Sequence, residues 1–266
     1  MSLLGRIVDA FKPYRDEDVP EPSAFGVTRA GQERLSQLPA GSGVVLSRGS
    51  AGIVAREEPT ADAVTVDGLD PKDLRGLLLD YEDGWRLAVD LSLRAAATPN
   101  PNGRLYTLNR RIAAGAASFY SQGTVNLPLP AALLAFPGVQ SVLFRGHTVT
   151  VEREHKDIDW QRIDLHVNSS LQEYLLAAGP LIRSESPRYQ DPFAAEVAVV
   201  LEADILPAVH RDGGDLRLIE VRDGVVRLAM QGACRSCPSS SRTLHRGVES
   251  VLKRRFGDRV RGVVAV

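Results

Sequence analysis

The chain has 266 residues, more than most single domains contain, so two or three compact units are expected. Apolar residues make up 44% and charged residues 24%, which is typical of folded soluble proteins and excludes a disordered or fibrous chain. The formal net charge of -1 gives no reason to expect nucleic acid or an anionic membrane as partner, and no apolar run reaches the roughly 18 residues of a membrane helix.

Residues 1–22 indicate a short helix followed by an acidic, proline-containing connector, and we expect them to form an N-terminal arm. They lack the long apolar core of a secretory signal, and they are too acidic for a mitochondrial presequence. The two cysteines, three positions apart, are a poor disulfide framework for a secreted protein. The expected location is therefore the cytoplasm.

Residues 23–97 are expected to form the first structured unit. A helical pattern runs from Thr28 to Leu38, and apolar runs at 43–46, 63–66 and 85–89 predict strands. Residues 69–79 predict a short helix that leads into a strand at Asp80-Tyr81.

The order of these pieces resembles the A-type iron-sulfur carrier domain, in which a helix with a leading Thr is followed by a Gly-rich cysteine loop and an Asp-Tyr pair. The matching segments are Gly49-Ser50-Ala51-Gly52, Leu74-Arg75-Gly76 and Asp80-Tyr81. Ser50 stands where that family has its first cysteine, and a hydroxyl is a far poorer iron ligand than a thiolate. The resemblance implies a degenerate domain that holds no cluster of its own.

A second unit is expected over residues 98–179. Its start is marked by Thr98-Pro99-Asn100-Pro101-Asn102, because prolines alternating with asparagines end a helix and favour extended or turn conformations. Residues 131–136 predict a short helix, and residues 141–144 and 148–151 predict a hairpin. Trp160 and the run over residues 163–176 predict a closing helix.

This unit is similar to the Nfu N-terminal domain, which shares its opening T-P-N-P-N motif and the order of its apolar core. The matching residues are Thr98 to Asn102, Leu134-Ala135-Phe136, Gly138-Val139, Val142, Val149 to Val151 and Trp160. None of them has an evident catalytic role.

Residues 180–190 are interpreted as a linker, and residues 191–266 as the last domain. Asp191 and Pro192 fit the N-cap and first position of a helix, and Gly213-Gly214 fit its end. Residues 215–221 and 225–230 predict two strands joined by a hairpin at Asp223-Gly224. A helix over about 240–256 and an apolar run over 260–266 follow.

Both cysteines, Cys234 and Cys237, lie in one C-x-x-C motif between the last predicted strand and this helix. Such a pair serves a structural zinc site, a thioredoxin-type dithiol, an iron-sulfur cluster or a purely structural role. Zinc within one chain needs two more ligands, and no H-x-x-x-H or second C-x-x-C motif supplies them among His147, His155, His166, His210 and His245. A thioredoxin arrangement needs more strands after the motif than remain here.

An iron-sulfur cluster fits the pair better, because its iron corners need thiolates and two per chain leave a deficit. Cys234 and Cys237 from each of two chains supply four ligands for one four-iron cluster. The deficit therefore predicts a homodimer, at least when the cluster is loaded, and thiols that are exposed and unpartnered in a single chain.

Residues 199–264 resemble the NifU C-terminal, or Nfu, domain over nearly their whole length. The matches include Asp212-Gly213-Gly214-Asp215, Gly224-Val225-Val226, Gln231-Gly232-Ala233-Cys234 and Cys237-Pro238-Ser239-Ser240. The resemblance implies that a labile four-iron four-sulfur cluster is held between two subunits by Cys234 and Cys237 alone. It further implies that the cluster arrives from an upstream scaffold and passes to client apoproteins.

The sequence thus predicts an α+β protein of three small domains, the last with a short sheet packed on two helices and the C-x-x-C at a strand-to-helix turn. The predicted function is that of an iron-sulfur cluster carrier and not of an enzyme; the alternative is a dithiol-disulfide oxidoreductase. Near the cysteines, Gly232 is expected to let the backbone approach the cluster, Ser239 to Ser241 to cap the helix, and Arg235 to stabilise the cluster's negative charge.

Overall fold

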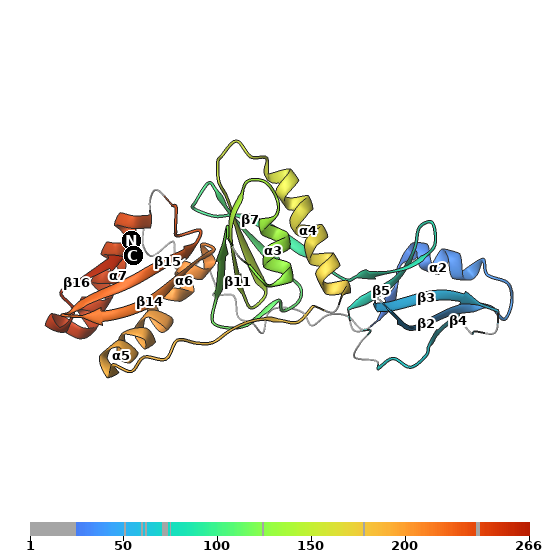
Figure 1. Ribbon diagram of the computed structural model, residues 1–266, viewed down its shortest axis with the longest axis horizontal. Coiled ribbons are helices and arrows are strands. Elements are labelled where there is room, and N and C mark those ends of the chain that lie inside the picture. The colour runs from blue at the N-terminus through green and yellow to red at the C-terminus, as the bar shows by residue number, and fades with distance from the viewer. Residues whose placement is uncertain are drawn as a thin grey trace, which may run out of the picture. The chain divides into compact units, whose positions relative to one another are not determined.

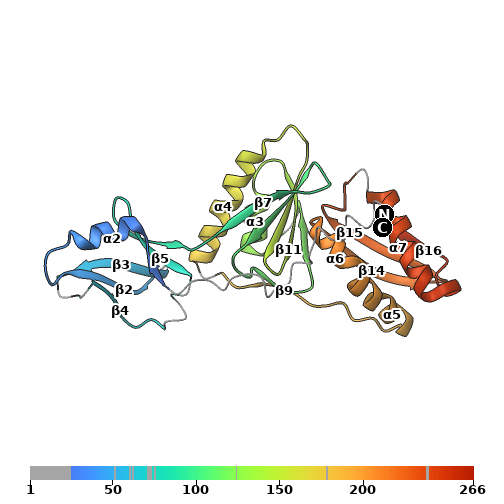
Figure 2. The ribbon, with the colours of Figure 1, turned by 180° about the vertical axis from the view of Figure 1, so that it is seen from behind.

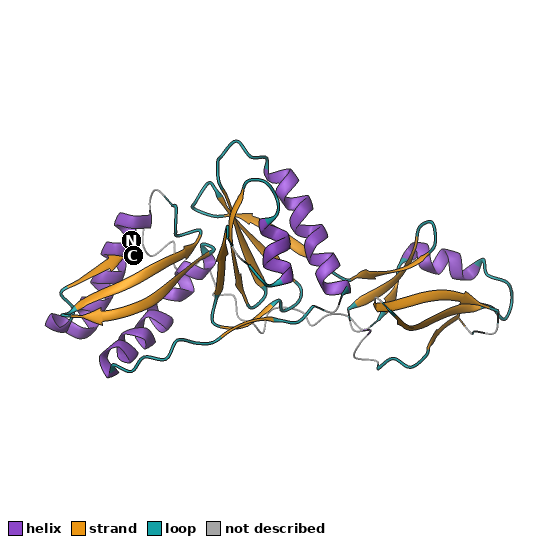
Figure 3. Ribbon diagram, in the orientation of Figure 1, coloured by secondary structure: helices purple, strands orange, loops and turns teal. Residues whose placement is uncertain are grey.

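The computed structural model describes residues 25–266, apart from residues 51, 60, 62, 71–73, 75, 124, 178, 238 and 239, and it describes residues 240–246 by their backbone alone. The predicted arm over residues 1–22 and the predicted serine cap of the last helix lie outside the described residues and side chains. Helices and strands are mixed along the chain, which confirms the α+β class (Figure 3). No helix in the described part of the chain is both long and apolar enough to cross a membrane.

The chain divides into two compact units. One contains residues 94–163 and 181–266, and the other contains residues 25–93 and 164–180. The three-domain division stays a prediction, and each unit is described by itself below.

The described residues between 25 and 93 form one helix, α2 (Arg29–Ser36), and two small sheets (Figure 1). One sheet has the order β1-β5-β6 and the other β3-β2-β4, with strands β1 (Gly26–Val27), β2 (Gly43–Gly49), β3 (Gly52–Glu58), β4 (Ala63–Val66), β5 (Leu77–Tyr81) and β6 (Trp85–Val89). The predicted helix at Thr28 and the strands at 43–46, 63–66 and 85–89 are confirmed. Thr28 begins α2 because its side chain accepts a hydrogen bond from the Gly31 backbone N–H.

The helix predicted over residues 69–79 is wrong at its C-terminal end. Residues from Leu77 onward form β5, the central strand between β1 and β6, where Leu77 and Leu79 are buried. A short apolar run fits a buried strand as well as a buried helix, and pairing on both sides decides for the strand.

Residues 93–153 form a five-stranded sheet with the order β10-β11-β12-β8-β7. Its strands are β7 (Leu93–Ala97), β8 (Gly103–Leu108), β10 (Ser118–Ser121), β11 (Val139–Arg145) and β12 (Thr148–Arg153). The predicted hairpin is β11–β12, and helix α3 (Pro128–Leu134) packs against β11 (Figures 1 and 2). The predicted closing helix is α4 (Trp160–Leu176), and β9 (Ala113–Gly115) pairs in parallel with β13 (Ile182–Ser184).

Residues 191–266 form a three-stranded sheet with the order β14-β15-β16 and the helices that pack on it. The elements are α5 (Pro192–Val200), the π-helical turn η3 (Leu201–Ile205), α6 (Leu206–Arg211), β14 (Gly214–Arg222), β15 (Val225–Gly232), α7 (Ser240–Phe256), η4 (Gly257–Arg259) and β16 (Gly262–Ala265). Local chemistry sets the boundaries as predicted. The Asp191 carboxylate caps α5, and Gly213 leaves α6 with φ 77°.

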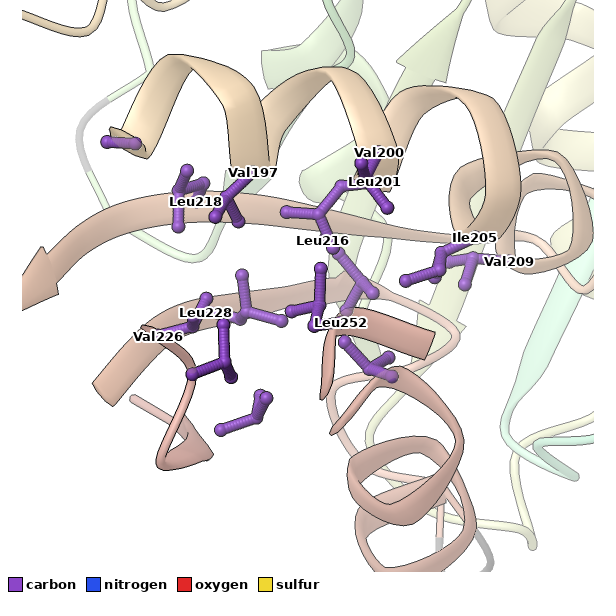
Figure 4. Packing of buried hydrophobic residues seen from close by; sticks show 14 of the residues in the cluster. Val197, Val200, Leu201, Ile205, Val209, Leu216, Leu218, Val226, Leu228 and Leu252 are labelled. Carbon is purple, nitrogen blue, oxygen red and sulfur yellow. The ribbon is translucent and has the colours of Figure 1, made fainter. Parts of the chain in front are cut away.

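The core of this part is apolar on the sheet face that the helices cover (Figure 4). Residues two positions apart along each strand point to the same side, so Leu216 and Leu218 of β14 face Val226 and Leu228 of β15 in one cluster. Helix residues complete it, among them Val197, Val200, Leu201, Ile205, Val209 and Leu252. Burial of each such side chain contributes roughly 1.5–3 kcal/mol to the stability of the fold. This core therefore fixes the position of β15, the strand from which the next segment begins.

Candidate functional site

Cys234 and Cys237 lie in the segment that joins β15 to α7, which we call the cysteine loop (residues 233–237). Its turn is made by backbone contacts: the Ala233 N–H donates to the Gly213 carbonyl oxygen at 3.1 Å, and the Arg235 N–H donates to the Gly232 carbonyl oxygen at 2.9 Å. Gly232 has φ 58°, a backbone conformation that residues with a side chain rarely adopt.

The structure places Gly232 against protein atoms. A Cβ atom at this position would lie 2.7 Å from both the Gly213 carbonyl oxygen and Leu143 Cδ2. The absence of a side chain at Gly232 therefore lets its backbone pack against Gly213 and β11. The predicted approach of this backbone to a cluster stays a prediction.

The expectation of exposed thiols is wrong for Cys234, which is 7% exposed and belongs to the apolar core cluster. A Cβ atom at Gly214 would lie 2.2 Å from Cys234 Sγ, so the sulfur occupies space that only glycine leaves open. Cys237 is half-buried. Both residues are thiols and not a disulfide.

Burial raises the pKa of the Cys234 thiol to about 12, and nearby negative charge adds to the effect. The contributing groups are Asp212, Cys237, Asp215 and Glu152, in that order. The Cys234 thiol in this conformation is therefore protonated at neutral pH and a weak nucleophile.

A cavity of about 420 Å³ adjoins the two cysteines, and both line it. Ile205 and Val209, which precede β14 in the chain, line the cavity with apolar side chains. Val248 and Val251 of α7 also line it. Asp212 also lines the cavity, and burial raises the pKa of its carboxyl group. The cavity thus offers two sulfur donors in a mostly apolar setting.

Two residues of the segment 98–103, Pro99 and Asn100, line the same cavity. Asn100 Nδ2 donates to the Ala233 carbonyl oxygen at 3.1 Å and to Ser236 Oγ at 3.0 Å. Ser236, between the two cysteines, also donates a hydrogen bond to the Glu152 carboxylate. These contacts were missed at the sequence level: Asn100 was recognised only as part of a start motif, and no signal marks Glu152.

The other candidate groups lie apart from the cavity or pair elsewhere. Asp215 pairs with His210 at 2.7 Å, and the Arg235 guanidinium carbon lies 5.7 Å from the centre of the Phe119 ring. Among the described residues, no group of three or more His, Cys, Asp or Glu side chains is arranged to hold a metal ion. The structure therefore places the two cysteines at one cavity, and no third metal-binding side chain among the described residues joins them.

Comparison with protein-family models matches two regions of the chain. A model described as NifU-like domain matches residues 197–264, and one described as scaffold protein Nfu/NifU N terminal matches residues 93–178. Neither match includes residues 23–92, so the A-type resemblance there stays a prediction.

Several curated proteins are similar to the chain. The Homo sapiens protein named NFU1 iron-sulfur cluster scaffold homolog, mitochondrial, is 32% identical over 59% of this chain and 65% of its own length. The Schizosaccharomyces pombe NifU-like protein C1709.19c is 31% identical over 60% of this chain and 67% of its own length. The Arabidopsis thaliana NifU-like protein 5, mitochondrial, is 31% identical over 64% of this chain and 66% of its own length.

Two of these relatives are named as mitochondrial, so the cytoplasmic location stays a prediction. A solved structure of protein SAV1430 from Staphylococcus aureus is 20% identical and covers 30% of this chain and 99% of its own, at a TM-score of 0.28 that is too low to support a conclusion. The NifU-like match lies within the unit that holds the cysteine loop, and the Nfu/NifU N-terminal match covers residues 94–163 of that unit and residues 164–178 of the other. The NifU-like relative from Schizosaccharomyces pombe, at 31% identity over 67% of its own length, supports the same assignment. The chain belongs to the Nfu/NifU family, with an Nfu N-terminal domain at residues 93–178 and a NifU-like domain at residues 197–264.

Proposed function

We propose that this chain is an iron-sulfur cluster carrier whose cargo is a four-iron four-sulfur cluster bound by Cys234 and Cys237. The observation that carries the proposal is that the chain's two cysteines line one cavity, in a domain that matches the NifU-like family. The name of the human relative adds support, because it describes an iron-sulfur cluster scaffold, and the family model for residues 93–178 is described as a scaffold protein.

The cluster is held between two copies of the chain. A four-iron cluster takes four thiolates, whereas one chain supplies two, and the described residues bring no third metal-binding side chain to them. A second Cys234 and Cys237 complete the set, which makes the loaded form a homodimer.

The chain's own groups determine how cargo enters and leaves. Cluster binding requires both thiols to lose their protons, and Cys234 must first leave a site where burial and Asp212 favour its neutral form. Because that site opposes the thiolate, thiolates of an apoprotein displace Cys234 readily and take the cluster by ligand exchange. No substrate is turned over, so the protein is a carrier and not an enzyme; it receives cargo from an upstream scaffold and delivers it to client apoproteins.

Anaerobic reconstitution tests the proposal. Purified chain incubated with iron, sulfide and a thiol reductant should form a dimer with about four irons and thiolate-to-iron charge-transfer absorbance. Cys234→Ser and Cys237→Ser should each lose the iron, whereas Ser250→Ala, an exposed change on α7, should retain it. A monomer that takes up no iron under these conditions would sink the proposal.

The alternative, a dithiol-disulfide oxidoreductase, is opposed by the burial of Cys234 and its pKa of about 12. Such enzymes attack with a thiolate whose pKa lies below the ordinary range. Insulin reduction by the reduced chain, measured against thioredoxin, checks this point, and a comparable rate would favour the oxidoreductase.

A further inference from the structure

We propose that the Nfu N-terminal domain holds the cysteine loop of the same chain in a closed state, and that this contact must open before a second copy can share a cluster. The residues responsible are Asn100, Glu152 and Ser236, which we call the loop clamp. The part of the proposal that concerns cluster sharing rests on the function proposed above.

The loop clamp is a partly buried hydrogen-bond network centred on one amide group. Asn100 Nδ2 lies 3.1 Å from the Ala233 carbonyl oxygen, 3.0 Å from Ser236 Oγ and 3.1 Å from Glu152 Oε1. Glu152 accepts a further hydrogen bond from Ser236, and its other oxygen accepts one from Ser141 at 2.7 Å. Asn100 and Glu152 are each 1% exposed, so their bonds to each other, to Ala233 and to Ser141 form away from water, where they hold geometry firmly, whereas Ser236 joins them from the exposed side.

Close packing accompanies the polar contacts. A Cβ atom at Gly103 would lie 3.1 Å from Ala233 Cβ, and one at Gly213 would lie 3.0 Å from Thr98 Cγ2. Strand β15, which leads into the cysteine loop, contacts both β11 and β12. The Nfu N-terminal domain therefore fits the loop by shape as well as by hydrogen bonding.

The clamp acts on the cysteines through Ser236. This residue stands between Cys234 and Cys237, so fixing its hydroxyl fixes the loop in the conformation that leaves Cys234 7% exposed. Pro99 and Asn100 also form part of the wall of the cavity that the two cysteines line. The thiols of a second copy would have to enter this space to complete a shared ligand set.

Closed and shared states are consequently alternatives. A second copy binds only the open state, so its apparent affinity is reduced by the fraction of chains that are closed. Opening leaves Glu152 with Asn100 and Ser141 of its own domain as partners, and water replaces Ser236. The carboxylate is thus satisfied in both states, which suits a contact that opens and closes.

The direct test is the reactivity of the apo thiols in the full-length chain. Ser236→Ala removes the hydroxyl that reaches Glu152, retains both cysteines and changes an exposed residue. A hydrogen bond to a charged group stabilises the closed state, so its loss should increase the fraction of open chains. The N-ethylmaleimide alkylation rate of Cys234 should therefore rise roughly tenfold or more. Ser250→Ala is the matched control, and its alkylation rate should equal that of the wild type.

A second variant opens the clamp by charge. In Asn100→Asp, Oδ1 can still accept from the Asn102 N–H, a contact of 3.0 Å, but the amide donor is replaced by an oxygen that faces Glu152. This variant should react faster than Ser236→Ala. Alkylation of both variants at the wild-type rate, with unchanged thermal unfolding, would overturn the clamp.

Reconstitution separates the clamp from the proposed function. Ser236→Ala should reach the same final iron content as the wild type but take up iron faster, because more chains are open. Failure of the wild type to bind iron refutes the carrier and leaves the apo alkylation result as the measure of the clamp. Equal uptake rates in an iron-binding wild type and variant refute the role of opening in cluster sharing.

Discussion

Cys234 occupies the space beside Gly214, where an added Cβ atom would lie only 2.2 Å from Cys234 Sγ. The pairing of β14 with β15 creates this proximity, because Gly214 stands opposite Gly232, two residues before the cysteine. The position of one proposed ligand is therefore set by a glycine on the neighbouring strand.

Gly214→Ala should displace Cys234 and destabilise the domain. Gly214 lies in a strand with ordinary φ, so the penalty comes from crowding and not from backbone strain, and overpacking of this kind costs about 1–3 kcal/mol. Denaturant unfolding of the full chain measures it. Gly262→Ala is the control, because a Cβ atom there meets nothing within 4 Å, and it should change the free energy of unfolding by less than about 0.5 kcal/mol. Equal losses in both variants would show that crowding at Cys234 is not the cause.

Asp212→Asn should lower the pKa of Cys234. Burial is the largest cause of the raised pKa, and the Asp212 charge is the next, so a neutral amide removes the second cause and leaves the first. The pH profile of Cys234 alkylation, followed by mass spectrometry, should move to lower pH. Asp258→Asn, an exposed change in the same domain, should leave the profile in place. A profile that does not move in Asp212→Asn contradicts the assigned role of this carboxylate.

Alkaline pH should weaken the fold through Cys234. Its folded-state pKa of about 12 lies above the ordinary value of 9.0, so the unfolded chain loses this proton first. The stability that the neutral thiol contributes is fully present below pH 9 and is lost between about pH 9 and 12, by at most about 1.4 kcal/mol per pH unit. The Cys234→Ala variant has no thiol to titrate at this position. The difference between the denaturant midpoints of the wild type and this variant should therefore become smaller as the pH rises. A gap that stays constant to pH 11 would contradict the raised pKa.

The features that sequence patterns predicted correctly depend on residues close together in the chain. Asp191 caps α5 through the N–H groups of Phe193 and Ala194, and the Asp223-Gly224 hairpin forms because both residues take positive φ. Such contacts span two or three positions, so residue type and spacing are enough to reveal them.

The features that sequence patterns missed depend on distant residues. Ser236 meets Glu152 across 84 positions and Asn100 across 136, and no local signal pairs them. The burial of Cys234 also depends on Gly214, twenty positions earlier, which was interpreted only as the end of a helix. The site was recognised from its cysteines, but its enclosure is a property of the tertiary fold.

Thr28→Ala should weaken the unit that contains residues 25–93. Thr28 Oγ1 donates to Asp80 Oδ1 at 2.6 Å and accepts from the Gly31 N–H at 3.1 Å, so one side chain caps α2 and ties it to β5. Loss of the cap should cost about 1 kcal/mol, measured as faster hydrogen exchange of the α2 amides.

The pH dependence of this variant identifies the Asp80 contact. The hydrogen bond from Thr28 is the main cause of the lowered pKa of Asp80, so the stability that it contributes is present at neutral pH and is lost as pH falls through that pKa. The difference between wild type and Thr28→Ala should therefore shrink in acid. Ser36→Ala, which removes an exposed hydroxyl bonded to the Glu33 carbonyl oxygen at the far end of α2, should show no such narrowing. A Thr28→Ala deficit that is constant from neutral pH into acid would mean that the cap alone, without Asp80, accounts for the role of Thr28.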